Sequence, residues 1–190
     1  MSGDTQAPYR VTGTREHFRG ALFSVVTDTV TMPDGTSAVR DYLRHVGAVC
    51  VVAVDDEERV VMLRQYRHPV REVLWEVPAG LLDVAGEDPR EAAARELAEE
   101  AGLTAGHWEQ LITIYTTPGI ADEKIRIFLA RDLSPVGPEY AYDRVFEEAT
   151  MTLHRIPLDE VMSMMDRGEI TNGVHAVGLL AAWRRLRASS

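Results

Sequence analysis

Residues 80–103 of the chain read GLLDVAGEDPREAAARELAEEAGL and carry the signals that decide its fold. Asp88 suits the N-cap position of a helix, Pro89 the first helical position, and Gly102 the residue just past the end. At about 100° per residue, a helix between these signals gathers its apolar residues into one stripe. The stripe consists of Ala93, Ala94, Leu97, Ala98 and Ala101. The sequence therefore predicts an amphipathic helix over residues 89–101.

The same helix carries a cluster of carboxylates. Glu96 and Glu100 are four residues apart, so they share one line that borders the apolar stripe. Glu99 lies further round toward solvent, where Arg95 can pair with it at i, i+4. Two carboxylates at this spacing repel each other, and a hard divalent cation such as Mg²⁺ relieves the repulsion because it binds carboxylates together with substrate phosphates. The charges alone leave two interpretations open, a Mg²⁺ or Mn²⁺ site for phosphate chemistry and a solvated acidic face.

The wider pattern resembles a known family. Residues 95–103, RELAEEAGL, match the core REUxEExGU of the Nudix box, in which U is aliphatic. Glu87 precedes Arg95 by seven intervening residues, as the box requires, and Gly80 is the leading glycine. Six residues separate Gly80 from Glu87 where the usual box has five, which we interpret as a one-residue insertion in the loop before the helix. The resemblance implies an α/β fold, a Nudix-type α/β/α sandwich with a mixed sheet and an added N-terminal β-region.

The stretch before the box narrows the resemblance. Residues 75–80, WEVPAG, are similar to the W-E-x-P-A-G stretch of ADP-ribose pyrophosphatases. The resemblance implies metal ligands at the backbone carbonyl of Ala79 and the carboxylates of Glu96 and Glu100, with Glu87 and Glu99 as further candidates. It gives Arg95 the task of orienting a carboxylate. Trp75 is a candidate substrate-stacking platform or, alternatively, a core residue beside a strand end.

Residues outside the box are candidates for substrate binding. Arg64, Arg67 and Arg71 fall within RQYRHPVR, and arginine is suited to bidentate phosphate contacts. Arg67 is the favoured candidate for gripping a pyrophosphate, and solvated arginines are the alternative. Glu123 follows a Pro118-Gly119 pair that also resembles the ADP-ribose pyrophosphatases, which implies a contact to the terminal ribose; a loop charge is the alternative.

A general base is expected outside the box. In ADP-ribose pyrophosphatases a glutamate that enters the last strand has this role, and Glu148 fits that position best. Glu147 is the close alternative and Glu139 a third. Residues 133–144 are expected to form a loop, and long loops often act as functional lids.

The remaining elements follow from local patterns. Ala21–Met32 and Ser37–His45 alternate as strands around a Pro-Asp-Gly turn, and a lone hairpin needs a partner to be stable. The resemblance implies that this hairpin region, residues 1–45, lies in a homodimer interface, with the Nudix hydrolase domain over residues 46–190. Further strands are predicted at 46–54, 59–66, 108–115, 124–130 and 150–156, and further helices at 157–167 and from about 174 to 187.

Composition bounds the class of protein. A chain of 190 residues with 45% hydrophobic content can bury a sizeable core. The net charge of -10 argues against a nucleic-acid partner, and it opposes an anionic substrate unless a metal and local arginines intervene. The single cysteine, Cys50, lies in an apolar run and is expected to be a buried, inert thiol. No apolar segment suits a signal peptide or a membrane span, so a cytoplasmic protein without a membrane partner is predicted.

The predicted function follows from the resemblance. It implies Mg²⁺-dependent hydrolysis of the pyrophosphate of ADP-ribose to AMP and ribose 5-phosphate. Two alternatives stay open: a pyrophosphatase for another nucleoside diphosphate sugar, and a Nudix module that senses a nucleotide without cleaving it. The intact set of Glu96, Glu99 and Glu100 weighs against the sensor.

Overall fold

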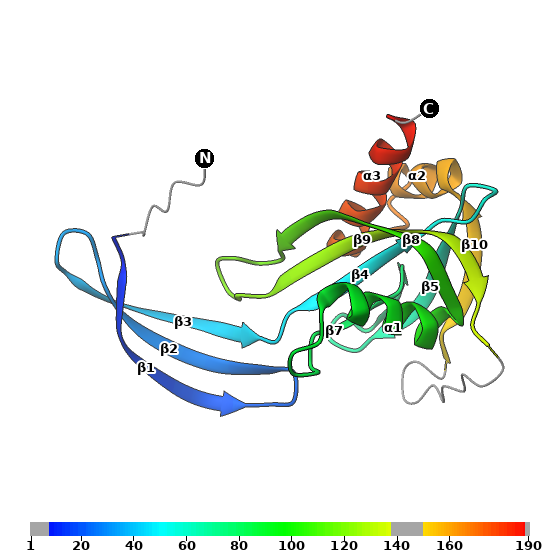
Figure 1. Ribbon diagram of the computed structural model, residues 1–190. Coiled ribbons are helices and arrows are strands. Elements are labelled where there is room, and N and C mark those ends of the chain that lie inside the picture. Colours follow the sequence, from blue (N-terminus) through cyan, green and yellow to red (C-terminus); the bar gives the residue numbers. More distant parts are fainter. Residues whose placement is uncertain (1–7, 138–149, 189–190) are drawn as a thin grey trace. The chain divides into compact units, whose positions relative to one another are not determined.

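The computed structural model describes residues 8–137 and 150–188 (Figure 1). The strands are β1 (Arg10–Arg19), β2 (Phe23–Thr31), β3 (Ser37–His45), β4 (Ala48–Ala53), β5 (Arg59–Arg67), β6 (Glu72–Glu76), β7 (Ala79–Leu81), β8 (Leu103–Tyr115), β9 (Lys124–Pro135) and β10 (Thr152–Pro157), and the helices are α1 (Pro89–Ala101), α2 (Leu158–Asp166) and α3 (Gly173–Arg187). The chain divides into two compact units. Unit 1 comprises residues 1–46 and 115–124, and unit 2 comprises residues 47–114 and 125–190.

Unit 1 is built on a three-stranded antiparallel sheet in the order β1-β2-β3. The predicted hairpin is confirmed as β2 and β3, whose register runs from the pair Phe23 and His45 to the pair Thr31 and Ser37. The strand β1 was not predicted, because its sequence RVTGTREHFR is mostly polar. β1 is exposed along its whole length, and its register with β2 shifts twice.

The segment 115–124 belongs to unit 1 because it is hydrogen-bonded to β3. The amide of Leu43 donates to the carbonyl of Ile120 at 2.8 Å, and the amide of Asp122 donates to the carbonyl of Leu43 at 3.1 Å. The amide of His45 donates to the Asp122 carboxylate at 2.7 Å. A stretch that lies between β8 and β9 in sequence is thereby attached to the N-terminal sheet, which the sequence pattern does not indicate.

Unit 2 contains a four-stranded sheet, β7-β4-β9-β8, and a three-stranded sheet, β10-β5-β6. The larger sheet is mixed, as predicted, since β4 runs parallel to β9 and antiparallel to β7. The short strands β6 and β7 were not predicted. β8 begins at Leu103, directly after α1, and β9 continues to Pro135. The expected loop over residues 133–144 is therefore wrong at its first three residues, which pair in the sheet.

The two faces of the larger sheet are covered by different helices, α1 on one and α2 with α3 on the other (Figure 1). The pleat of β4 sends Cys50 and Val52 toward α2 and α3, and Val49 and Val51 toward α1. A strand that is apolar at every position is what a sheet buried on both faces requires. The predicted α/β/α sandwich is confirmed.

The helices α2 and α3 begin close to where the sequence places them. The Asn172 side chain accepts a hydrogen bond from the amide of Val174 at 3.2 Å and so caps α3. Gly168, at φ 74°, follows α2 and permits the chain to turn. In the part of the chain that the structure describes, no helix combines the length and the apolarity needed to cross a membrane.

Cys50 lies fully buried on β4. Burial, reinforced by the charges of Glu76 and Glu100, raises the pKa of the Cys50 thiol well above its usual value. The thiol therefore stays protonated, and the prediction of an inert core cysteine is confirmed.

Candidate active site

The helix α1 has the ends that its sequence predicts. The Asp88 carboxylate accepts a hydrogen bond from the amide of Arg90 at 2.9 Å, and Gly102 closes the helix at φ 65°. Just before the helix, the amide of Glu87 donates to the carbonyl of Val84 at 3.1 Å, and Gly86 adopts φ 81°. The six-residue spacing between Gly80 and Glu87 ends in this turn and leaves the helix regular.

Two carboxylates of α1 are buried against β7. Glu96 is 9% exposed and Glu100 is 4% exposed. The amide of Ala79 donates to Glu100 Oε2 at 2.8 Å. A Cβ atom at Gly80 would lie 2.0 Å from the Cδ atom of Glu96, so the two segments approach this closely only because residue 80 has no side chain. The WEVPAG segment and the box helix therefore form one site.

Arg95 joins three carboxylates of this site. Its Nε and Nη2 donate to the two carboxylate oxygens of Glu87, each at 3.1 Å. Its Nη1 donates to Glu96 at 2.7 Å and to Glu99 at 3.3 Å. The predicted pair of Arg95 with Glu99 is confirmed, and Glu87 and Glu96 add to it. The hydrogen bonds to Glu87 raise the pKa of Arg95 against the opposing effect of burial, so the guanidinium stays charged.

The chemistry of this site fits a hard divalent cation. Its carboxylate oxygens are ligands that such cations prefer, and two of the carboxylates are withdrawn from water. Within residues 8–137 and 150–188, however, no group of three or more His, Cys, Asp or Glu side chains is arranged to hold a metal ion. Arg95 is central to this geometry, because Glu87, Glu96 and Glu99 all turn toward its guanidinium, whereas Glu100 turns toward Ala79. The metal-binding roles stay predictions.

The favoured pyrophosphate-binding residue, Arg67, lies at the end of β5 and pairs with a buried acid. Its Nε donates to Glu76 Oε1 at 2.9 Å and its Nη2 donates to Glu76 Oε2 at 2.5 Å. Glu76 is 1% exposed, whereas the Arg67 side chain is 40% exposed. Glu76 therefore fixes the Nε and Nη2 edge of the arginine, whose side chain stays partly exposed.

The other candidates around this strand have different surroundings. The Arg64 guanidinium lies 5.2 Å from the centroid of the Trp75 ring, a cation–π arrangement, and the His154 ring meets the Trp75 ring edge-on at 5.0 Å. Trp75 is half-buried and packs against the core cluster on the α2 and α3 side of the sheet, as the core interpretation expects. Arg71 lies in an exposed turn at φ 59°. The structure brings Arg67 and Trp75 to neighbouring strands but gives no phosphate role to any of these residues.

Glu123 lies in unit 1. Thr116 Oγ1 donates to Glu123 Oε2 at 2.5 Å, and His45 Nδ1 lies 3.6 Å from Glu123 Oε1. The ribose contact of Glu123 stays a prediction.

The candidates for the general base, Glu148, Glu147 and Glu139, lie outside the described residues.

Sequence reasoning missed a buried polar cluster beside the candidate site. Glu76 appears within the WEVPAG stretch without an assigned role, and its partners Asn172 and His175 come from α3 and the residue that caps it. The only local signal was a glutamate in an otherwise apolar strand. Partners almost a hundred residues away leave no mark in a local pattern.

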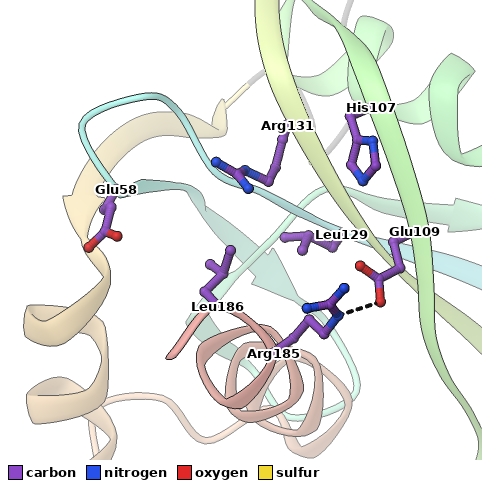
Figure 2. A pocket seen from close by; sticks show the side chains of 7 residues that line it. All are labelled: Glu58, His107, Glu109, Leu129, Arg131, Arg185 and Leu186. Carbon is purple, nitrogen blue, oxygen red and sulfur yellow. Dashed lines mark hydrogen bonds and ion pairs between the residues drawn. The ribbon is translucent and has the colours of Figure 1, made fainter. Parts of the chain in front are cut away.

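A hollow in unit 2 lies apart from the residues of the candidate active site. Its volume is about 280 Å³, and it is lined by Glu58, His107, Glu109, Leu129, Arg131, Arg185 and Leu186 (Figure 2). It mixes acidic and basic side chains, and Arg185 Nε donates to Glu109 at 2.7 Å (Figure 2). It contains no residue of α1 or of the WEVPAG segment, so the carboxylate chemistry described above lies elsewhere.

Comparison with known proteins places these features in context. The family model described as the NUDIX domain matches residues 43–170. An ADP-ribose pyrophosphatase from Mycobacterium tuberculosis is 46% identical over 162 residues, which cover 85% of this chain and 77% of that protein. An ADP-ribose pyrophosphatase from Bacillus subtilis is 34% identical over 153 residues, 80% of each protein. A crystal structure of an ADP compounds hydrolase has the same fold, with a TM-score of 0.77 at 23% identity and 96% of each chain covered.

Proposed function

The chain belongs to the Nudix family of hydrolases, and from that premise we propose that it hydrolyses the pyrophosphate of ADP-ribose to AMP and ribose 5-phosphate. The observation that carries the proposal is the pair of buried carboxylates, Glu96 and Glu100, held against Ala79 and Gly80. Buried carboxylates are unfavourable without compensating charge, and a cation-assisted reaction on phosphates uses such a site. The relatives named ADP-ribose pyrophosphatase support the choice of substrate.

Nudix hydrolases generally use divalent metal ions, and we infer Mg²⁺, with Mn²⁺ as a substitute. The ligands in this proposal are the carbonyl of Ala79 and the carboxylates of Glu96, Glu100, Glu99 and Glu87. A cation bound there supplies charge to neutralise the pyrophosphate and lowers the pKa of a bound water. Arg95 holds three of these carboxylates in place, so its task in this proposal is to orient ligands.

The chain's other residues bind substrate and move a proton in this proposal. Arg67 contacts the diphosphate in this proposal, because its side chain is 40% exposed and a guanidinium suits bidentate contacts to phosphate. Trp75, Arg64, Arg71 and Glu123 are supporting candidates from the sequence. Glu148, or Glu147 next to it, accepts the proton of the attacking water as a general base.

We also propose that unit 1 contributes a homodimer interface. All ten residues of β1 are exposed in the single chain, and several apolar side chains of unit 1 face solvent. Val11 and Phe18 of β1 are 54% and 52% exposed, and Phe23 of β2 is 39% exposed. An exposed edge strand with apolar side chains is a ready surface for association, and a second copy of the chain would cover it.

The function is tested with a panel of nucleoside diphosphate sugars that includes ADP-ribose, each incubated with protein and Mg²⁺, with Mn²⁺, or with EDTA. We expect cleavage of ADP-ribose to AMP with either cation and none with EDTA. Glu100→Gln should lose most turnover with an unchanged circular dichroism spectrum, because Gln is a good helix former. Glu91→Gln, at an exposed position on the same helix, is the matched control and should retain full activity.

Two results would replace the proposal. Faster cleavage of another nucleoside diphosphate sugar would move the substrate assignment to that compound. Tight binding of a compound in the panel without turnover of any would show a sensing module in place of an enzyme.

A further inference from the structure

The buried carboxylate of Glu76, on β6, accepts hydrogen bonds from a residue of β5 and from the residue that caps α3. Besides the two hydrogen bonds from Arg67, Glu76 Oε1 accepts one from Asn172 Nδ2 at 3.0 Å. A buried carboxylate is tolerated when its charge is paired and its oxygens are hydrogen-bonded. Burial raises the pKa of Glu76, but Arg67, His175 and Asn172 outweigh burial and hold the pKa below the ordinary value. The group is therefore ionised at neutral pH.

His175 fixes the segment that follows Glu76. Its Nδ1 lies 3.0 Å from the amide nitrogen of Val77 and accepts that N–H. An accepting Nδ1 requires the neutral ring with its proton on Nε2, and Nε2 lies 3.5 Å from Glu76 Oε2. Burial lowers the pKa of His175 to about 4, with Glu76 opposing and Arg67 adding to this effect, so the neutral ring is the stable form at pH 7.

These contacts connect the buried cluster of Glu76 and His175 to two parts of the candidate site, Arg67 and the segment that leads to Ala79. Glu76 holds the Nε and Nη2 edge of Arg67, and His175 holds Val77, two residues before Ala79. The amide of Ala79 in turn donates to Glu100 of α1. The position of Arg67 relative to the box helix is therefore set by residues that are themselves nearly inaccessible to substrate.

We propose that Glu76, braced by Asn172 and His175, is a positioning residue that holds the Arg67 guanidinium ready for the substrate's diphosphate group. This inference rests on the proposed function. Glu76 is too buried to touch substrate, so it acts through Arg67. A long side chain that is already ordered loses less conformational freedom when the ligand binds, and the planar guanidinium presents a fixed edge to phosphate oxygens.

The test measures affinity separately from turnover. Binding of ADP-ribose is measured by calorimetry in excess EDTA, where no hydrolysis is expected, and kcat and KM are measured with Mg²⁺. Glu76→Gln should raise both Kd and KM about tenfold, a loss of one well-oriented charged contact, while kcat changes by less than about twofold. The matched control is Glu72→Gln, which removes a negative charge at the cross-strand neighbour of Arg67 without touching the Glu76 pair. It should leave Kd unchanged.

A double-substitution cycle separates positioning from a merely structural role. If Glu76 acts through Arg67, then adding Glu76→Gln to Arg67→Gln weakens binding no further, because the interaction is already lost. A further, additive rise in Kd when the second substitution is made would overturn the proposal. So would an unchanged Kd in a folded Glu76→Gln protein.

Asn172→Ser covers the case in which Glu76→Gln does not fold. Serine preserves the N-cap of α3 but removes the amide donor to Glu76. It should raise Kd by about threefold, less than the loss of the Glu76 charge, since one neutral hydrogen bond is removed. A folded Asn172→Ser protein with wild-type Kd would count against positioning. A wild-type protein that neither binds nor cleaves any compound of the panel would instead remove the proposed function itself.

Discussion

Glu76 and Glu96 show how this chain keeps carboxylates out of water by two different means. Glu76 is matched by one arginine, one amide and a neutral histidine, each from a different place in the sequence. Glu96 is matched by the adjacent Arg95, which also holds two further glutamates. The first arrangement buries the Glu76 carboxylate almost completely and suits a fixed support. The second is built on α1, where Arg95 keeps the carboxylates of Glu87, Glu96 and Glu99 together.

The neutral state of His175 leads to a prediction about stability and pH. The pKa is about 4 in the folded protein and 6.5 for an ordinary histidine, so the unfolded chain binds a proton that the folded protein excludes. The contribution of this group is complete above pH 6.5 and is lost as the pH falls toward 4. Between pH 7 and pH 5 the loss should be about 2 kcal/mol of unfolding free energy. Urea unfolding at the two pH values measures it.

The control for this prediction is His175→Gln, which cannot titrate in the same range. The variant is expected to be less stable at both pH values, but its unfolding free energy should fall less between pH 7 and pH 5. Contributions of groups outside this cluster are common to both proteins and cancel in the comparison. Equal losses in the wild type and the variant would show that His175 is not the group responsible.

Residues of the candidate site differ in how far the sequence reveals them. The placement of Glu96 and Glu100 on one side of a helix was predictable, because local start and stop signals define that helix and its geometry fixes their spacing. Arg67 was predicted as a phosphate ligand from its residue type, but its pairing with Glu76 depends on two strands meeting. The role of His175 depends on α3 reaching Val77, just after β6, a long-range contact that no local pattern encodes.

Elements follow the same rule as residues. The ends of α1 were predictable because Asp88 and Gly102 act within one turn of the helix. Strand β1 was missed because it lacks apolar alternation and is stabilised by pairing with β2. The long extensions of β8 and β9 likewise depend on their neighbours in the sheet. Propensity and pattern fix what the chain does locally, and pairing decides where strands end.

The next prediction concerns Glu148 as the general base, in the segment that precedes β10. Glu148→Gln should lower kcat by about 10²- to 10⁴-fold, the range for groups that transfer a proton, with little change in KM because a base acts mainly in the transition state. Steady-state kinetics with ADP-ribose and saturating Mg²⁺ measures this. Both Glu148 and Glu147 lie outside the described residues, so the choice between them rests on the sequence.

Glu147→Gln is the paired control for the base. If Glu147→Gln loses turnover while Glu148→Gln stays active, the general base is Glu147. If both variants stay active, a box carboxylate or the cation alone activates the water, and Glu99 becomes the next candidate. Glu99 is bonded to Arg95, which would have to release it for that role.

At the scale of the whole molecule, the division into two units changes how the dimer proposal should be tested. Deleting the residues before His45 would remove the strand that holds the segment 115–124, because Leu43 supplies both a donor and an acceptor to it. Such a deletion would therefore disturb the rest of unit 1. A monomer obtained this way would not distinguish a lost interface from a damaged fold.

Substitutions on the exposed surface of β1 avoid this ambiguity. Val11→Lys and Phe18→Lys place charges at side chains that are more than half exposed in the single chain, so the fold should tolerate them. If β1 lies in a homodimer interface, the pair should convert a dimer into a monomer, since two desolvated ammonium groups oppose association. Leu180→Lys, at a 49% exposed position on α3, is the matched control and should stay dimeric. Sedimentation equilibrium over a range of concentrations measures the masses. A monomeric wild type, or a doubly substituted protein that remains a dimer with unchanged affinity, would show that unit 1 has another role.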